Sequence, residues 1–512
     1  MPLDIPSPSL AYVSALPLLL VFGAALVSVL VEAFVPNAQR RLVQIVLSVA
    51  GLGGAVAACI ALAGTRELIF SDAIAVDGPA LFLQGLLALL GVASVLLLSE
   101  RSLDSSGGAV VARAQVLPGS REDVALAEAT EVQTEIYPLA LFSLGGMMLF
   151  TSANNLLLMF IALEVLSLPL YLMAGLARRR RLLSQEAAVK YFLLGAFSSA
   201  FFLYGVALLY GYAGGVDLGQ VLTATQTAGT QDGLLLLGLA MLTVGLLFKI
   251  GAVPFQAWTP DVYQGSPTPV TALMAACTKI AAFGALARVL YVGFGTTRWD
   301  WRPMMWAIAI LTMAIGAVLA VTQTDVKRML AYSSVAHTGF LLIGVIALND
   351  TGLRGLLFYL AAYGFTTLAA FAVVTLVRDG RGEATHLAAW AGLGRKSPLV
   401  AGTFALLLFA LAGIPLTSGF IGKFAVFTGG VGGGATALVV VGVVASAVTA
   451  FFYAKVVVLM FFNEPAPDGP TVSVPSAYTA LVIALGLAVT VVLGVLPQPL
   501  LELASRASVF VY

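Results

Sequence analysis

Residues 233–256 read GLLLLGLAMLTVGLLFKIGAVPFQ, an apolar run with one lysine, Lys249, shortly before one proline, Pro254. A helix needs about 20 apolar residues to cross the hydrocarbon core of a bilayer. Proline lacks a backbone donor and its ring clashes with the carbonyl four residues earlier. The run therefore predicts a membrane helix that breaks close to its lysine.

Similar runs fill the rest of the chain, whose 512 residues are 60% hydrophobic and only 10% charged. Lipid offers no partner to an unpaired backbone group, and the runs are too long for barrel strands, so each is expected to be a helix. The sequence predicts an all-α polytopic membrane protein with fourteen transmembrane spans. They lie at residues 9–35, 41–63, 78–99, 136–152, 154–176, 186–212, 232–256, 268–293, 303–323, 328–348, 354–377, 398–428, 435–462 and 476–500.

The lysines and arginines of the loops predict the orientation, because they concentrate on the inner side. If the N-terminus is outside, the inner loops hold clusters such as Arg178 to Arg181, and the outer loops keep only scattered arginines. Both termini are then on the outer, periplasmic side of a bacterial cytoplasmic (inner) membrane. The first span is expected to be retained rather than cleaved. The net charge of +1 gives no reason to expect a nucleic-acid partner.

The chain has few residues that hold metals or cofactors. Cys59 and Cys277 lie in different predicted spans, and the only histidines are His337 and His386. This set cannot build an iron–sulfur cluster, a haem site or a zinc site at the usual spacings. A P-loop is also missing from the sequence. We expect no cofactor and no metal in this chain, so any redox chemistry belongs to partner subunits.

Five of the seven lysines lie inside predicted spans: Lys190, Lys249, Lys279, Lys423 and Lys455. A charge at bilayer depth costs at least about 2.5–3.5 kcal/mol, so such groups usually face the bundle interior and mark an ion or proton path. Lysine, unlike arginine, can lose its proton when it is desolvated. The pattern predicts a proton path inside the membrane.

Glu164, near the middle of its span, is the expected carboxylate partner of a lysine in this path; a purely structural hydrogen bond is the alternative. Lys279 is central in its span and is expected to relay protons. Lys423 follows Gly413-Ile414-Pro415, a second predicted interruption. Two interrupted spans in the two halves of a chain indicate an ion path.

The other candidates have an alternative role each. Lys190 lies about one turn inside its span and could extend to the interface, but we include it in the path with Glu164 and Lys249. For Lys455 both interpretations stay open. His337 could be a satisfied hydrogen-bonding residue, but its chemistry suits proton transfer near neutral pH, and we include it too.

Residues 101–135 form the one extended polar interruption. Glycine, serine and acidic residues predict an inner-side loop, partly disordered. It is either a docking or regulatory segment or a tolerated insertion.

Three stretches resemble a known family. Residues 248–263 (FKIGAVPFQAWTPDVY), 323–334 (QTDVKRMLAYSS) and 411–424 (LAGIPLTSGFIGKF) are similar to motifs of the antiporter-like subunits of respiratory NADH:quinone oxidoreductase (complex I). The later two are most similar to those of the subunit N type. Subunit M carries glutamate at the position of Lys423, and subunit L continues with a long amphipathic helix. The resemblance covers about residues 136–459.

The resemblance implies two inverted five-helix repeats with spans 7 and 12 interrupted. The implied organisation is helices 1–3 (1–100), the polar loop (101–135), a first repeat of spans 4–8 (136–293), a second of spans 9–13 (303–462), and helix 14 (463–512). It also implies that Glu164 and Lys249 interact, that Lys279 connects the halves, that Lys423 is the terminal gate, and that Lys190 is functional.

The resemblance further implies proton translocation driven by electron transfer from NADH to quinone in other subunits. Partner subunits of the membrane arm would then surround the chain, and FMN, iron–sulfur clusters, NADH and quinone would be bound elsewhere in the complex. Two alternatives are a subunit of a multisubunit cation/proton antiporter and a scaffold whose buried charges only hold helices together. The match at 413–424 favours a subunit of NADH:quinone oxidoreductase over an antiporter subunit. Five lysines inside predicted spans disfavour the scaffold.

Overall fold

The computed structural model describes residues 11–512 except 104–107, 112–115, 118, 129–132, 228–232, 381 and 466–468. The α-helices are α1 (Leu16–Phe34), α2 (Asn37–Ala61), α3 (Gly78–Leu98), α4 (Arg121–Glu128), α5 (Ile136–Ser152), α6 (Leu156–Ala174), α7 (Arg181–Ala213), α8 (Leu218–Thr227), α9 (Gly233–Ile250), α10 (Trp258–Gly265), α11 (Thr268–Leu273), α12 (Lys279–Arg288), α13 (Arg298–Thr322), α14 (Val326–Ile346), α15 (Asp350–Val374), α16 (Leu393–Lys396), α17 (Pro398–Ala412), α18 (Ser418–Gly432), α19 (Thr436–Phe462), α20 (Ala477–Val495) and α21 (Gln498–Arg506).

Short elements of other kinds complete the chain. Two π-helical turns, η1 (Met274–Thr278) and η2 (Val289–Gly293), continue α11 and α12, and η3 (Leu387–Trp390) is a 3₁₀ turn. Strands β1 (Glu67–Ile69) and β2 (Ile74–Val76) form an antiparallel hairpin with Ile69 opposite Ile74. Strands β3 (Val377–Asp379), β4 (Gly382–Glu383) and β5 (Thr471–Val472) form a small antiparallel sheet in the order β4-β3-β5.

The chain is a polytopic helical membrane protein. In the described part, twelve helical segments are long and apolar enough to cross a membrane, and the apolar helices α5 and α17 are shorter. Each of the fourteen predicted spans is helical over most of its length where it is described. The long segment from Thr268 to Gly293 combines α11, η1, α12 and η2, and all residues of its most apolar 18-residue stretch are buried.

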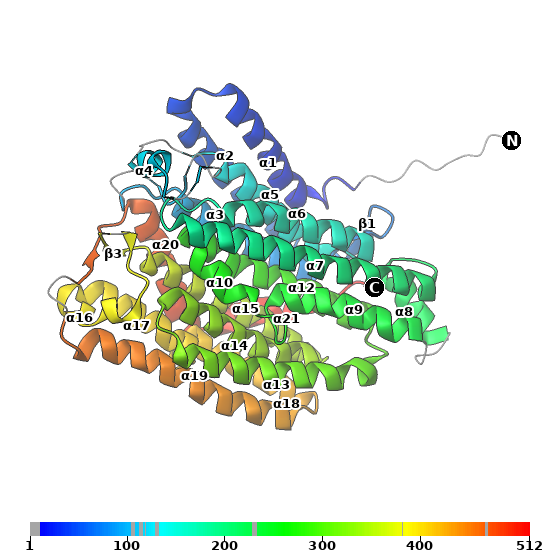
Figure 1. The fold of residues 1–512 in the computed structure, drawn as a ribbon. Helices are drawn as coiled ribbons and strands as arrows, with labels where there is room; N and C mark the ends of the chain where they lie inside the picture. Colours follow the sequence, from blue (N-terminus) through cyan, green and yellow to red (C-terminus); the bar gives the residue numbers. More distant parts are fainter. Residues whose placement is uncertain are drawn as a thin grey trace.

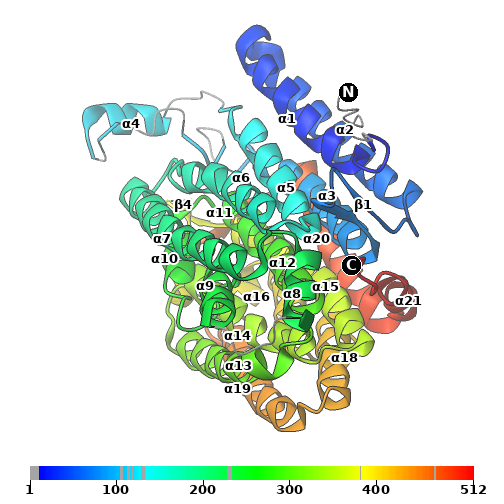
Figure 2. The same ribbon diagram turned by 90° about the vertical axis from the view of Figure 1, so that its right-hand side faces the viewer.

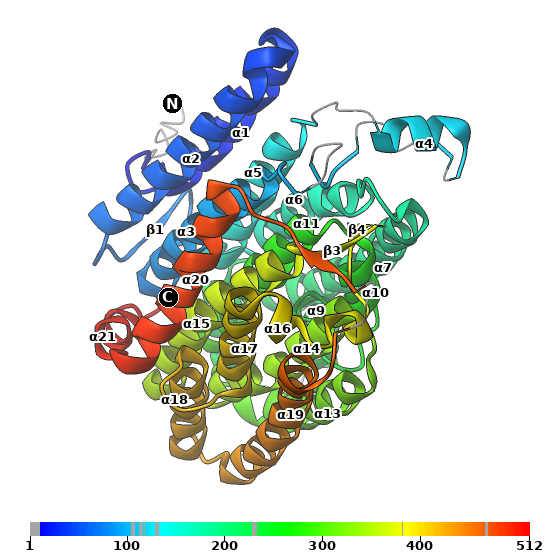
Figure 3. The same ribbon diagram turned by 90° about the vertical axis from the view of Figure 1, so that its left-hand side faces the viewer.

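The helices run roughly parallel in one bundle (Figure 1). The pair α1 and α2 lies at one edge of this bundle and α18 and α19 lie at the opposite edge, as the two turned views also show (Figures 2 and 3). Helices α14 and α15 lie between these edges. In each of them, 94% of the residues in the most apolar 18-residue stretch are buried. Polar groups on these central helices therefore lie far from lipid.

Two helices are interrupted, as the sequence predicts. Helix α9 ends at Ile250, directly after Lys249, and α10 begins at Trp258. Helix α17 ends at Ala412 and α18 begins at Ser418. Each break starts with a glycine at positive φ, where other residues are strained: Gly251 has a φ of 72° and Gly413 of 84°.

Loops from distant parts of the chain meet at each end of the bundle. At the first end, which we call the arginine end, the loop before α7 carries Arg178, Arg179 and Arg180 and contacts residues 108–111 and 383–385. Ser476 donates to Glu100 there as well. At the opposite end, Ala153 forms a β-bridge with Ile74. Arg302 donates a hydrogen bond to the Gly433 carbonyl there, and the backbone N–H of Val511 donates to Asp77.

The polar segment 101–135 differs from a simple loop. Its described parts include α4, which projects away from the bundle (Figures 2 and 3). Val110 forms a β-bridge with Ala177, so residues 108–111 are docked against the loop before α7. Residues 104–107, 112–115, 118 and 129–132 of the predicted disordered loop lie outside the described residues.

Candidate functional site

Lys249 is held at the C-terminal end of α9, with 4% of its surface exposed. Its Nζ donates to Ser167 Oγ on α6 over 2.6 Å, and Tyr191 Oη on α7 is 3.5 Å away. The rings of Tyr191 and Tyr171 lie 5.4 and 5.9 Å from the ammonium, within the range of cation–π attraction. The ammonium is thus surrounded by hydroxyl groups and aromatic faces.

Glu164 lies one helical turn before Ser167 on α6, and residues three apart share a helix face. The described residues contain no cation within ion-pair distance of its carboxylate, and its Oε1 is buried without a hydrogen-bond partner. The expected partners therefore sit on the same side of the site, but Ser167 and not Glu164 contacts the Lys249 ammonium directly.

Lys279 begins α12 immediately after the π-helical turn η1. It is 4% exposed, and its Nζ donates to the Ser334 carbonyl over 2.6 Å and to Thr338 Oγ1 on α14. Thr338 in turn donates to the carbonyl of Ile250, the neighbour of Lys249, over 2.8 Å. A short polar chain thus joins the first helix break to Lys279.

His337 occupies the middle of α14 and is 1% exposed. Its Nδ1 shares a 2.6 Å hydrogen bond with Tyr359 Oη and its Nε2 a 3.3 Å one with Tyr453 Oη. The imidazole is 5.1 Å from the Tyr363 ring, which Lys279 faces, and 5.8 Å from the Phe340 ring, which Lys423 faces. His337 therefore lies between the two lysines.

Lys423 lies in the first turns of α18, just after the second break, and is 4% exposed. Its Nζ donates to the Ala412 carbonyl over 2.8 Å and to Ser446 Oγ over 2.9 Å. The Phe340 ring is 4.7 Å from the ammonium. In the described part of the chain, no carboxylate forms an ion pair with it.

Gly413 makes this approach feasible. A Cβ added there would lie 3.0 Å from Cδ and 3.2 Å from Nζ of Lys423. Both contacts are tighter than most real Cβ contacts, so a side chain at this position would push the lysine away from the break.

Lys190 is not in direct contact with Lys249 or Glu164. Its side chain is 40% exposed, and its Nζ forms 2.6 Å ion pairs with Glu186 and with Asp261 on α10. Asp261 also pairs with Arg328 of α14 at 2.6 Å. The structure thus connects Lys190 to the half-helix that follows the first break, by way of a carboxylate that the sequence did not single out.

Lys455, the remaining lysine candidate, is exposed on α19. Arg288, a cation that the sequence analysis did not place in the path, is fully buried in a 2.7 Å ion pair with Asp77 and also donates to the Thr151 carbonyl. Within the described residues, no group of three or more histidine, cysteine or acidic side chains could hold a metal ion.

Sequence reasoning missed most of the hydroxyl groups in the site. Polar or aromatic residues inside apolar spans are common and seldom distinctive. Helical spacing from a candidate charge could have singled out Ser167, which lies three residues after Glu164 on the same helix. The missed hydroxyl groups are those of Ser167, Tyr191, Thr338, Tyr359, Ser446 and Tyr453.

The chain matches known proteins over its whole length. The model of the family described as "NADH:quinone oxidoreductase/Mrp antiporter, TM" matches residues 153–449. An NADH-quinone oxidoreductase subunit N of Parafrankia sp. is 62% identical over 98% of this chain and 95% of its own length. One from Rhodococcus opacus is 59% identical over 99% and 97%, respectively.

Solved structures show the same fold. A chain in the structure "Respiratory complex I from Thermus thermophilus with bound Aureothin" is 34% identical, covers 96% of this chain and 99% of its own, and superposes with a TM-score of 0.77. A chain of the Mrp complex from Dietzia sp. gives a TM-score of 0.81 at 23% identity, over 98% and 97%.

The antiporter alternative thus shares the fold at low identity, whereas the relatives named subunit N are similar along nearly the entire sequence. The chain belongs to the subunit N family of NADH-quinone oxidoreductases.

Proposed function

We propose that the chain is a proton-translocating subunit of the membrane arm of an NADH:quinone oxidoreductase. The observation that carries this proposal is the line of buried groups from Lys249 through Lys279 and His337 to Lys423, spaced by hydroxyl and aromatic side chains. Glu164 and Lys190 complete the path at the side of the first break.

The chemistry of lysine supports this role. The three buried ammonium groups are bonded to hydroxyl and carbonyl oxygens, which stabilise a positive charge without neutralising it. An unneutralised charge inside a membrane is costly, and lysine removes that cost by releasing its proton, which arginine does not do. Neutral and charged forms of each site can therefore alternate.

The helix breaks support proton access. Carbonyls freed at a helix end can bind water or an ammonium, and irregular backbone at membrane depth is tolerated only where it is buried or lines a wet cavity. Lys249 lies at the first break and Lys423 at the second. The π-helical turn before Lys279 adds a third irregular point, of a kind that is frequent at functional sites.

In this proposal, Glu164 controls the protonation of the first lysine in the path. An anion favours the charged state of a nearby lysine, so movement of negative charge toward or away from Lys249 would shift its proton occupancy. Ser167 lies on the same helix as Glu164 and is hydrogen-bonded to Lys249, so it would carry the proton between them. Lys190 and Asp261 would link this input to α10 and, through Arg328, to α14.

We further propose fourteen crossings, with α5 and the pair α17–α18 as two of them. The loops that this topology assigns to the inner side are those that meet at the arginine end, and the remaining loops meet at the opposite end. This agreement and the excess of basic residues support termini on the outer side of a bacterial inner membrane.

Two inverted repeats, residues 136–293 and 303–462, are part of the same proposal, with 1–100 and 463–512 as flanking helices and 101–135 as the connecting loop. Helix α7 packs along α9 and α10 in the first repeat, and α15 packs along α17 and α18 in the second. NADH, FMN, iron–sulfur clusters and quinone would be held by partner subunits, which contact this chain through its lipid-level surface.

The test uses the assembled complex in proteoliposomes. Lys249→Ala should strongly reduce quinone reduction coupled to proton uptake, by at least about ten-fold if the lost interactions are worth ~1.5–3 kcal/mol. Oxidation of NADH by an artificial acceptor at the flavin should stay intact. Lys455→Ala, which removes an exposed lysine, is the matched control and should pump normally. Wild-type pumping by Lys249→Ala would remove Lys249 from the path.

A further inference from the structure

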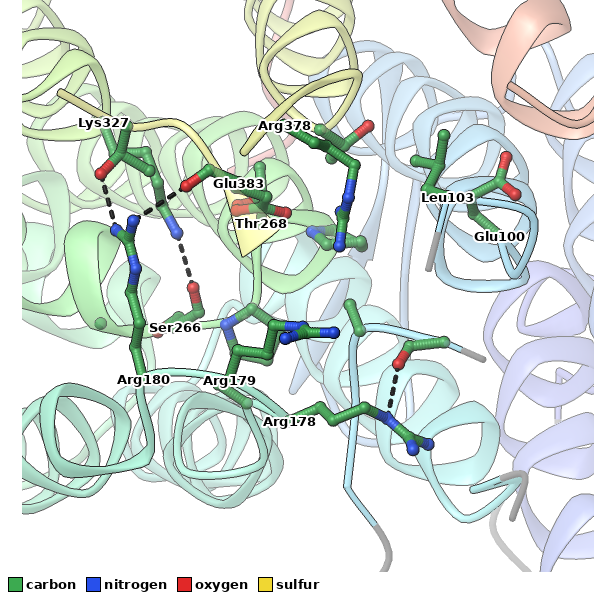
Figure 4. Close-up of a pocket in the computed structure, with 18 of the residues that line it drawn as sticks. Glu100, Leu103, Arg178, Arg179, Arg180, Ser266, Thr268, Lys327, Arg378 and Glu383 are labelled. Carbon is green, nitrogen blue, oxygen red and sulfur yellow. Dashed lines mark hydrogen bonds between the residues drawn. The ribbon is translucent and has the colours of Figure 1, made fainter. Parts of the chain in front are cut away.

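The cavities at the arginine end differ in their lining. One of about 80 Å³, shown in Figure 4, is crossed by hydrogen bonds between its own walls, such as the one from Lys327 to the Ser266 carbonyl. Another, of about 390 Å³, lies between the ends of α13 and α19, the start of α14 and η3. Because a space above about 10–15 Å³ holds one water molecule, this larger cavity has room for a chain of them.

The larger cavity is polar where it is exposed and apolar where it is buried. Its exposed lining includes Thr324 before α14, His386 before η3 and Asn463 after α19, all of them outside the long helices. Met329 of α14 and Val456 of α19 also line it, and they are only 1% and 2% exposed. The cavity therefore enters the bundle from the arginine end and ends on an apolar floor.

A hydrogen-bonded chain lies one helical turn behind this floor. On α14, Met329, Ser333 and His337 are spaced four residues apart and share one face. Tyr453 of α19 shares one hydrogen bond with Ser333 and another, of 3.3 Å, with Nε2 of His337. Val456 lies three residues nearer the arginine end than Tyr453. At about 1.5 Å per residue, the floor and the Ser333–Tyr453 pair are roughly 5–6 Å apart.

We propose that the larger cavity is a second proton entry, which leads from the inner side to His337 through Ser333 and Tyr453. This entry bypasses the first break, and it rests on the proposed function of the chain and on its proposed orientation. A hydroxyl group both donates and accepts hydrogen bonds, so it passes a proton on without a net change. Ser333 takes a proton from cavity water and gives its own to Tyr453, which gives its own to Nε2 of His337.

The apolar floor is the closed gate of this entry. It consists of Met329, Val456 and Phe452, whose ring centre lies 4.1 Å from that of Tyr453. These side chains offer water no strong hydrogen bond, so the layer stays dry at rest. A permanent water connection would short-circuit the pump, because His337 also lies on the line toward the second break. Met329 has an unbranched, flexible side chain, which can swing aside during turnover.

The experiment measures passive proton leak in proteoliposomes that hold the assembled complex and a preset pH difference, without NADH. Met329→Ser shortens the floor and gives water a hydroxyl partner, so the pH difference should collapse at least about five-fold faster than with wild type. The matched control is Met305→Ser on α13. Met305 is fully buried like Met329, but it lies nearer the opposite end and does not line the cavity, so this variant should hold the gradient like wild type.

The route behind the floor is tested by a second substitution. Tyr453→Phe removes only the hydroxyl group, so adding it to Met329→Ser should return the leak rate to within about two-fold of wild type. Val456→Thr keeps the shape of the side chain and adds a hydroxyl to the floor, and it should speed the leak about two-fold. This variant takes the place of Met329→Ser if the latter does not assemble, as judged by NADH-driven quinone reduction.

If Met329→Ser holds the gradient as well as Met305→Ser does, the cavity is not a proton entry; a lipid tail that keeps the cavity dry would give this result. A leak that survives Tyr453→Phe would also overturn the proposal, because protons would then cross without the Tyr453 hydroxyl. Both outcomes leave the proposed function intact, since that function is tested by pumping in Lys249→Ala and not by passive leak.

Discussion

The two broken helices each hold a buried lysine ammonium, but with different groups. At the α9–α10 break the lysine precedes the break, and its ammonium is held by a hydroxyl group and two tyrosine rings, with a carboxylate one turn away on α6. At the α17–α18 break the lysine follows the break, and its ammonium folds back onto the last carbonyl of the first half-helix.

This difference matters because a carbonyl at a helix C-terminus carries a partial negative charge that is fixed. A carboxylate carries a full charge that protonation can remove. We therefore propose that the first break responds to a neighbouring charge through Glu164. The second is set by backbone geometry and by Gly413, and within the described residues it has no carboxylate partner. We infer that the first break receives the signal and that the second opens the final exit.

The largest effect is expected at the second break. Lys423→Ala should reduce pumping at least about ten-fold, and Lys423→Arg should assemble but pump almost as poorly, because arginine keeps its proton. Proton movement per NADH oxidised in proteoliposomes measures both. Full pumping by Lys423→Arg would mean that the site needs only a fixed positive charge.

Substitutions of Glu164 test whether the first break responds to a neighbouring charge. Glu164→Gln keeps the shape and removes the charge, so pumping should fall by about ten-fold, and Glu164→Asp should keep part of it. Rates of quinone reduction and of proton uptake would be compared in the same vesicles. If Gln and Asp variants behave alike, the carboxylate is only a structural hydrogen-bonding group, and the distinction between the breaks disappears.

Two tyrosines offer a matched pair. Tyr359 shares a 2.6 Å hydrogen bond with His337, whereas Tyr191 is 3.5 Å from Lys249. A hydrogen bond contributes about 0.5–1.5 kcal/mol, so Tyr359→Phe should slow pumping roughly two- to ten-fold. Tyr191→Phe should change it less, because a 3.5 Å contact is marginal. Steady-state proton uptake measures both variants, and the reverse order would argue against a role for His337 in the path.

The smallest effect is expected from the two glycines. Gly413→Ala and Gly251→Ala both force alanine into a left-handed conformation, which costs roughly 1–2 kcal/mol each. Only the first also crowds a lysine. Thermal unfolding of the complex should therefore shift similarly in both, while pumping falls by a few-fold only in Gly413→Ala. Equal pumping would show that Lys423 does not depend on its contact with the break.

The sequence predicted more of the fold than of the site. Apolar runs located nearly every long helix, since the membrane requires a minimum length of continuous apolar helix. Pro254 and Pro415 pointed to both breaks, because a proline removes a backbone donor and favours a kink or break in a helix interior. The helix α4 within the polar segment was not predicted, because a short helix outside the membrane leaves no long apolar signal.

The candidate lysines and His337 could be chosen from sequence because charge in an apolar span is costly and therefore rare. Their order in space could not, because it depends on which helix faces which. Asp261, one of several acidic residues in the chain, becomes the partner of Lys190 only when α10 packs against α7. Ser167 likewise becomes the contact of Lys249 only when α6 lies beside the end of α9.

Sequence by itself determined the membrane class, the helical spans, the two breaks and the family, because these depend on local composition and on motifs that are continuous in the chain. Tertiary structure alone decided that Lys249 and Glu164 share one side without a direct ion pair and that Thr338 joins the first break to Lys279. These features arise from side chains on segments far apart in sequence, and only the packing of the bundle brings such side chains within hydrogen-bonding distance.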